Sequence, residues 1–136
     1  MRAFREAVEA GDLDAVEALL AEDVVFTSPV VFKPYPGKAI TAAILRAVSQ
    51  VFEDFRYERE LSGGTDGRDH ALVFAARVGD RELTGCDFIH VDDNGLIDEL
   101  TVMVRPLSGA QALAAAMGAR FGEIAKEAEA RSASAS

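Results

Sequence analysis

Two short stretches of helical periodicity open the chain. From Arg2 to Ala10, apolar residues recur on one helical face, and Gly11 ends the segment. Asp12 then stands where a helix N-cap belongs, and the apolar stripe that follows it reaches Leu20. The pattern therefore predicts a helical hairpin, in which two helices are joined by a tight Gly-Asp corner.

A short strand and a third helix are predicted next. Val24–Ser28 is rich in β-branched and aromatic residues and stops at Pro29, which is typical of a strand that ends at a proline. The segment from Lys33 to Gly37 contains two prolines and predicts a loop. Apolar residues at helical spacing then predict a helix over Lys38–Phe52.

The rest of the chain alternates like a strand meander and ends in a helix. Turn signals separate the strand segments, and the strongest of them is Asp92-Asp93-Asn94-Gly95. A long apolar stripe predicts a helix from about Ser108 to Ala130, and we expect residues 131–136 to form a disordered tail. The predicted strands are Phe55–Leu61, His70–Val78, Glu82–Val91 and Leu96–Arg105.

This order of elements indicates the fold class. Helices first and antiparallel strands afterwards are typical of an α+β fold, and the length fits a single domain over residues 1–130. Both faces of the predicted meander are apolar: Ala71 and Val73 share one face of their strand, while Leu72 and Phe74 share the other. A sheet covered on one side by its own helices should show one polar face. We therefore expect a homodimer packed through the outer sheet face.

Composition narrows the classes of function. The net charge of −9 argues against nucleic acid, because phosphate binding needs clustered lysine and arginine, and it disfavours anionic membrane surfaces. No segment approaches the ~20 apolar residues that span a bilayer, and the acidic N-terminus is not expected to be a signal peptide. Cys86 is the single cysteine, so we expect no internal disulfide and a cytoplasmic location. His70 and His90 stand apart from any further Cys or His cluster, and we expect no metal and no cofactor.

Three segments, taken in order, resemble the nuclear transport factor 2-like superfamily: AVEAGDLDAVEALLAEDVVFTSPV, PYPGKAITAAI and LIDELTVMVRP. Within it the chain is most similar to the SnoaL-like polyketide cyclases and ketosteroid isomerases. The resemblance covers about Met1 to Pro106 and implies a cone-shaped fold, in which a curved antiparallel or mixed sheet of about four to six strands and three helices enclose a pocket. The C-terminal helix is an extension, which either closes the pocket or contacts a partner subunit. This fold hosts isomerases, cyclases, hydrolases, dehydratases and binders.

The catalytic set of the ketosteroid isomerases carries over only in part. Their base is a carboxylate just before the proline that ends the first strand, where this chain has Ser28. Their oxyanion tyrosine precedes the glycine of the corner by seven residues, where this chain has Phe4. Their second oxyanion donor, a carboxylic acid in the third meander strand, corresponds to Asp87. Steroid isomerisation by that mechanism is therefore not expected.

The epoxide hydrolases of the superfamily give a second comparison. They place an arginine two residues before this acid, where the chain has Gly85. Their second carboxylate lies in the last strand, where the chain has Val102, Met103 and Val104. Epoxide hydrolysis is poorly supported as well.

Asp87 remains the candidate catalytic residue. If the orientation of the family holds, it points into an apolar pocket, where desolvation raises the pKa of its carboxyl and favours the neutral acid, a donor for a ligand carbonyl or hydroxyl. The alternative is structural, with Asp87 bonded to the backbone or paired with Arg77 or Arg105. The other residues expected to line the pocket are Phe4, Phe26, Ser28, Tyr35, Phe52, Ile89, Val102 and Val104.

Two classes of function stay open at this point. The first is a metal-free enzyme of the isomerase, cyclase, dehydratase or hydrolase type, acting on a small apolar molecule that bears a carbonyl or hydroxyl group. The second is a non-catalytic ligand-binding or dimerisation module. The scarcity of polar pocket residues favours the second class, because general acid–base catalysis usually needs two titratable groups.

Overall fold

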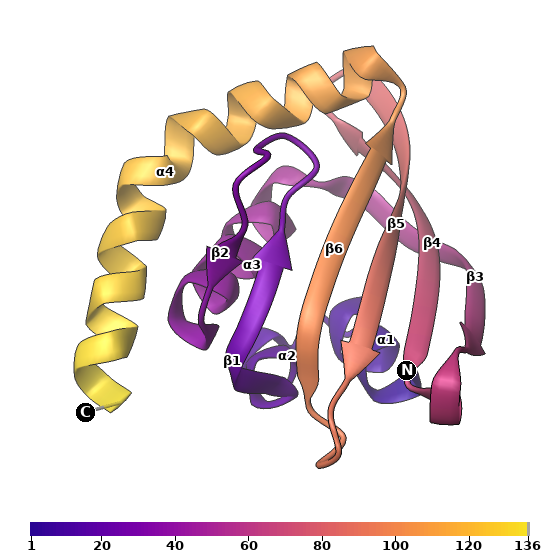
Figure 1. Cartoon of the computed structure of the whole chain (residues 1–136). Coiled ribbons are helices and arrows are strands. Elements are labelled where there is room, and N and C mark those ends of the chain that lie inside the picture. The colour runs from indigo at the N-terminus through magenta and orange to yellow at the C-terminus, as the bar shows by residue number, and fades with distance from the viewer. Residues whose placement is uncertain (136) are drawn as a thin grey trace.

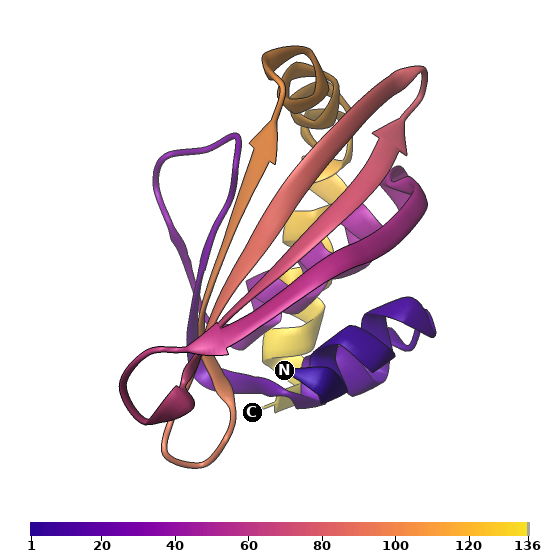
Figure 2. The same cartoon turned by 90° about the vertical axis from the view of Figure 1, so that its right-hand side faces the viewer.

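The structure, a computed structural model, describes residues 1–135 and consists of a twisted sheet with helices packed on one of its faces (Figures 1 and 2). The helices are α1 (Arg2–Glu9), α2 (Leu13–Ala18), α3 (Lys38–Val51), α4 (Leu107–Ala135) and a short 3-10 turn, η1 (Thr65–Gly67). The strands are β1 (Leu20–Thr27), β2 (Tyr35–Pro36), β3 (Glu53–Gly63), β4 (Asp69–Val78), β5 (Arg81–Val91) and β6 (Ile97–Arg105). Within this range no helix is both long and apolar enough to cross a bilayer.

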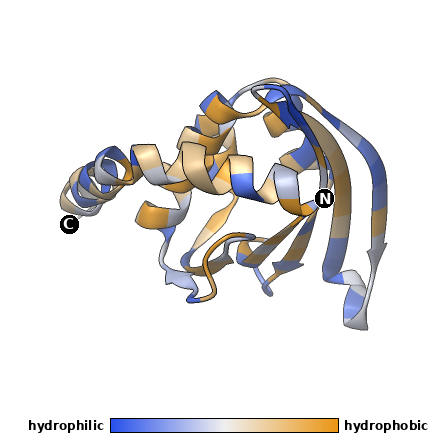
Figure 3. Cartoon of the chain, turned by 90° about the horizontal axis from the view of Figure 1, so that it is seen from above, coloured by the Kyte–Doolittle hydropathy of each residue, from blue (hydrophilic) through white to orange (hydrophobic). Residues whose placement is uncertain are grey.

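The strands form one mixed sheet in the order β2-β1-β6-β5-β4-β3. The pair β1–β6 is parallel, and every other pair is antiparallel. Figure 3 shows the strands curving around one side of the helices, with hydrophilic and hydrophobic residues alternating along them. The predicted α+β fold, with a curved mixed sheet wrapped by helices, is therefore confirmed.

The first half of the chain differs from the sequence prediction at two boundaries. Helix α2 ends at Ala18, and β1 already begins at Leu20, whereas the pattern predicted helix through Leu20 and strand only from Val24. The cause is a long-range pairing, because the Ile97 amide donates to the Leu19 carbonyl at 2.8 Å. The predicted loop from Lys33 to Gly37 contains β2, which pairs with the end of β1.

The helical hairpin forms as its local signals predict. The Asp12 carboxylate accepts a hydrogen bond from the Ala15 amide at 3.1 Å and so caps α2. Gly11 has a φ of +70°, a conformation that favours glycine, and lets the chain turn between α1 and α2. The hairpin and α3 bury their apolar faces against the inner face of the sheet, where Leu20, Leu72 and Ile97 lie at the centre of the core.

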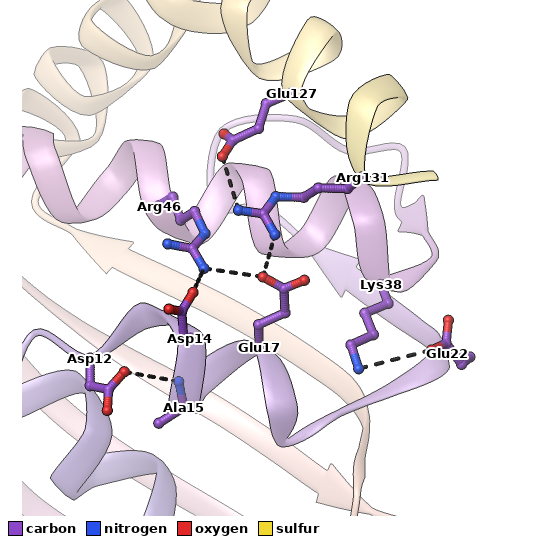
Figure 4. Close-up of polar contacts among 9 residues, drawn as sticks. All are labelled: Asp12, Asp14, Ala15, Glu17, Glu22, Lys38, Arg46, Glu127 and Arg131. Atoms are coloured by element: carbon purple, nitrogen blue, oxygen red, sulfur yellow. Dashed lines mark hydrogen bonds and ion pairs between the residues drawn. The ribbon is translucent and has the colours of Figure 1, made fainter. Parts of the chain in front are cut away.

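Helix α4 continues past Ala130, where we predicted a disordered tail, as far as Ala135. Its last turns are fixed by Arg131, whose guanidinium donates to Glu17 of α2 and, at 3.1 Å, to Glu127 (Figure 4). Arg46 of α3 donates to the same Glu17 carboxylate at 3.2 Å and also to Asp14. Glu17 therefore joins α2, α3 and α4 in one ion cluster.

We predict that Glu17→Gln lowers the free energy of unfolding by about 1–3 kcal/mol, because two half-buried guanidinium groups lose their shared anion. The Glu17 side chain is only 24% exposed, so solvent screens this loss poorly. Glu22→Gln is the matched control: Glu22 pairs with Lys38 but is 85% exposed, and its loss should cost less than about 0.5 kcal/mol. Urea denaturation measures both, and equal effects would contradict the role given to the cluster.

Candidate functional site

A cavity of about 600 Å³ lies between the inner face of the sheet and the helices. Strands β1, β3, β4, β5 and β6 supply one side of it, while α1, α2, α3 and α4 supply the other. Almost all of the side chains that line it are apolar, and Asp87 is the one carboxylate among its described lining residues. The cavity has the size and polarity of a small-molecule site.

Asp87 lies in the middle of β5 and faces the helices. Its neighbours across the sheet are Leu72 of β4 and Val102 of β6, and it is only 8% exposed. The Tyr57 hydroxyl of β3 lies 2.9 Å from Asp87 Oδ2 and donates to it when the carboxyl is ionised. The alternative pairings are wrong, because Arg77 pairs with Glu53 and Asp54, and Arg105 lies on the opposite face of the sheet.

Burial among apolar groups sets the protonation of this pair. Desolvation raises the pKa of Asp87 to about 7, although the hydrogen bond from Tyr57 works in the lowering direction. Burial also raises the pKa of Tyr57, and the neighbouring Asp87 adds to that effect. Near neutral pH the pair therefore offers a carboxyl that exchanges its proton readily and a phenol that keeps its own.

An aromatic cluster holds the Tyr57 ring in place. Phe55 meets it edge to face at 4.9 Å between ring centroids, and Phe74 meets it in the same way at 6.4 Å. From the side of α1, the Arg5 guanidinium lies 5.9 Å from the centre of the Tyr57 ring. These contacts come from β3, β4 and α1, so the position of the hydroxyl depends on the folded sheet.

Gly85 gives the cluster the room that it needs. It precedes Asp87 by two residues on the same face of β5, and a Cβ added there would lie 2.4 Å from the Phe74 ring and 2.7 Å from the Met103 carbonyl oxygen. A longer side chain at this position, such as the arginine of the epoxide hydrolases, would displace Phe74. The glycine is therefore a packing requirement of the aromatic cluster.

Most of the residues predicted from the sequence lie around this cavity. Its lining includes Phe4, Phe26, Ser28, Tyr35, Phe52 and Val102, together with Asp87. Ile89 and Val104 are not among the lining residues: Ile89 is buried within the core, and Val104 is partly buried against it. Period two placed both on the correct face of the sheet, but it does not show how far the cavity extends along a strand.

Ser28 stands where the related isomerases have their base, and it is engaged in a turn. Its Oγ accepts a hydrogen bond from the Val30 amide at 3.1 Å. No described basic or second acidic side chain lines the cavity near it. A serine hydroxyl is a far weaker base than a carboxylate, and without an activating base it is also a poor nucleophile.

Tyr57 and the residues of α4 were not among the pocket residues predicted from the sequence. The alternation of the strand from Phe55 to Leu61 places Phe55 and Tyr57 on one face, which was the available signal for Tyr57. Helix α4 runs along α3 (Figure 1). It forms one side of the cavity of its own chain. The α4 residues in the cavity lining are Leu113, Ala114, Met117, Gly118, Phe121 and Ile124.

The arrangement nearest to a metal site lies on the other face of the sheet. His90, Asp98 and Glu99 hold their ligand atoms within 4.8 Å of one another. The His90 Nδ1 atom already lies 2.6 Å from Asp98, which raises the pKa of this histidine. This group is separate from the cavity and from Asp87.

We predict that Asp87→Asn stabilises the protein more at pH 8 than at pH 5. The folded-state pKa of about 7 lies above the ordinary value of 3.8, so the folded protein holds the extra proton between these limits and loses stability as pH rises. The stability gained by the variant should grow by about 2–3 kcal/mol from pH 5 to pH 8. Chemical denaturation at both pH values measures it. Asp80→Asn, at a side chain that is 95% exposed, is the matched control. A gain for Asp87→Asn that does not change between pH 5 and pH 8 would refute the raised pKa.

Comparison with known proteins agrees with the fold. The family model of the SnoaL-like domain matches residues 1–100. A solved steroid delta-isomerase from Pseudomonas aeruginosa is 47% identical, with a TM-score of 0.83 over 88% of this chain and 87% of that one. An uncharacterised protein with a cystatin-like fold from Silicibacter pomeroyi is 38% identical, with a TM-score of 0.84 over 94% and 91%.

More distant structures share the fold alone. One from Pseudomonas putida, assigned as a polyketide cyclase, is 23% identical, with a TM-score of 0.65 over 79% of this chain and 90% of that one. No protein with a curated description matches the chain. The match over residues 1–100, more than half of the 136 residues, decides the assignment: the chain belongs to the family of SnoaL-like domains.

Proposed function

We propose that the protein binds a small, mostly apolar molecule with a carbonyl or hydroxyl group and catalyses its acid-assisted isomerisation or cyclisation. The observation that carries this proposal is the buried Asp87–Tyr57 pair, set in the wall of a mostly apolar cavity. An apolar cavity with one polar group binds the body of a ligand by burial and fixes its orientation by one hydrogen bond.

In the proposed reaction, the ligand oxygen lies within hydrogen-bond distance of the Asp87 carboxyl and the Tyr57 hydroxyl. Neutral Asp87 donates to that oxygen, and the bond strengthens as negative charge develops there during enolisation. A pKa of about 7 suits this task, because an acid is most effective when its pKa is near the working pH. Solvent water takes the carbon-bound proton and returns a proton at the new position, since the described lining supplies no second carboxylate.

The related proteins support this class of chemistry. The 47% identical relative is described as a steroid delta-isomerase, an enzyme that acts on an apolar molecule. The wider group of similar structures includes a protein assigned as a polyketide cyclase. We therefore favour an apolar carbonyl compound as the substrate.

A non-catalytic binder is the second candidate function. The observation that favours it concerns the position where the related isomerases have their base. Here that position holds Ser28, whose Oγ accepts a hydrogen bond from the Val30 amide in a turn. Such a protein would use the same pair of residues to anchor its ligand. A ligand that binds with Asp87-dependent affinity and leaves chemically unchanged would identify this function.

We also propose that the protein acts as a homodimer in the cytoplasm. Four large apolar side chains are exposed on the outer face of the sheet: Val25 at 36%, Leu61 at 53%, Phe88 at 44% and Met103 at 58%. Exposed apolar groups that gather on one face commonly mark a protein interface. The single cysteine, Cys86, is free, as is usual in a reducing compartment.

We predict that the protein binds 2-naphthol about tenfold more tightly than naphthalene, because one buried hydrogen bond contributes about 1–1.5 kcal/mol. Asp87→Leu should remove this preference while leaving naphthalene affinity within about threefold, since leucine keeps the site apolar. Fluorescence titration measures the four affinities. Ser28→Ala is the matched control and should keep the preference; equal preference in the wild type and Asp87→Leu would refute Asp87 as the anchor.

A further inference from the structure

The outer face of the sheet carries its side chains in rows across β4, β5 and β6. The strand register gives two apolar central rows: Ala71, Phe88 and Thr101 in one, and Val73, Cys86 and Met103 in the next. They face away from the cavity, because the residues between them, Leu72, Asp87 and Val102, point inward. The two rows form one apolar strip across β4, β5 and β6; on β3, Leu61 continues the first row and Arg59 the second.

Charged rows border this strip on both sides. The row beyond Phe88 contains Asp69, His90 and Glu99 and is acidic. The row beyond Met103 contains Thr84 and Arg105, and Arg56 of β3 extends it, so this row is basic. The two rows next to the strip therefore differ in charge: the row on the side of the β5–β6 turn is acidic, and the row on the side of α4 is basic.

The positions of Glu99 and Arg105 show which orientation of two copies brings opposite charges together. Both are exposed residues on the outer face of β6, and they lie at equal distances from the midpoint between Thr101 and Met103. A twofold axis through that midpoint, perpendicular to β6 and in the plane of the interface, places Glu99 of one copy opposite Arg105 of the other. An axis parallel to β6 places Glu99 opposite Glu99 and Arg105 opposite Arg105, which repel.

We infer that a second copy of this chain docks on the outer face with its strands antiparallel, so that the apolar strips cover each other and two Glu99–Arg105 ion pairs form between the copies. This inference rests on the homodimer proposed above and adds its orientation. The interface is isologous, which means that both copies use the same surface. The Glu99–Arg105 pair therefore occurs twice. The next row, beyond Arg105, holds Glu53, Arg77 and Glu82, and its Arg77 guanidinium already pairs with Glu53 and Asp54 within the same chain.

The test is a charge-reversal cycle read by sedimentation velocity over a range of protein concentrations. Glu99→Arg and Arg105→Glu should each weaken dimerisation at least about tenfold, because each variant places like charges at both pairs. The double variant, Glu99→Arg with Arg105→Glu, should return the dissociation constant to within about threefold of the wild type. Glu129→Arg on α4 and Arg2→Glu on α1 are matched controls that make the same charge changes away from the sheet and should leave the dimer unchanged.

The possible outcomes separate the two proposals. A wild-type monomer at tens of micromolar would overturn both the dimer and its orientation. A wild-type dimer that Phe88→Asp dissociates but the single charge reversals leave intact would keep the dimer and overturn the antiparallel pairing. Weakened single variants without recovery in the double variant would also overturn it. Circular dichroism of each variant shows that loss of the dimer is not loss of the fold.

Discussion

The burial of the Asp87 carboxyl beside the Tyr57 hydroxyl is the interaction on which the account of this protein depends. A carboxylate among apolar side chains costs several kcal/mol unless it is paired or protonated, and here a single phenol lies 2.9 Å away. The packing of the sheet holds this pair in position. Gly85 leaves room for Phe74, and Phe74 with Phe55 fixes the Tyr57 ring. A polar pair held this firmly at a cavity wall is suited to recognise one oxygen of a ligand.

Strand β5 serves both faces of the sheet. Its inward residue Asp87 belongs to the cavity wall, and its outward residues, Cys86 and Phe88, belong to the apolar strip of the proposed dimer. Because successive side chains of a strand point to opposite faces, the site and the interface share one backbone. Helix α4 closes the cavity from within the same chain, and the Glu17 cluster keeps its last turns in place. The α4 side of the cavity is therefore formed by residues of the same chain.

The sequence was sufficient for most of the fold, because periodicity and turn residues are local. It identified the helical hairpin, the meander and Asp87, and its period-two pattern placed the inward faces correctly. It failed where distant residues decide the structure. The start of β1 depends on pairing with β6, the persistence of α4 depends on Glu17, and the partner of Asp87 lies 30 residues away on β3. Ile89 and Val104 were predicted to line the cavity and do not. The alternation along a strand shows which face a residue is on, but not how far the cavity extends along that strand.

The most direct test of the central claim is a carbon-13 NMR titration of the Asp87 side-chain carboxyl in the wild-type protein. The signal is assigned by its disappearance in Asp87→Asn. With the carboxyl buried in the cavity wall, its chemical shift should change with a midpoint near pH 7. A midpoint near the ordinary aspartate value of about 3.9 would show that the group is solvated and ionised, and would contradict its role as a neutral hydrogen-bond donor.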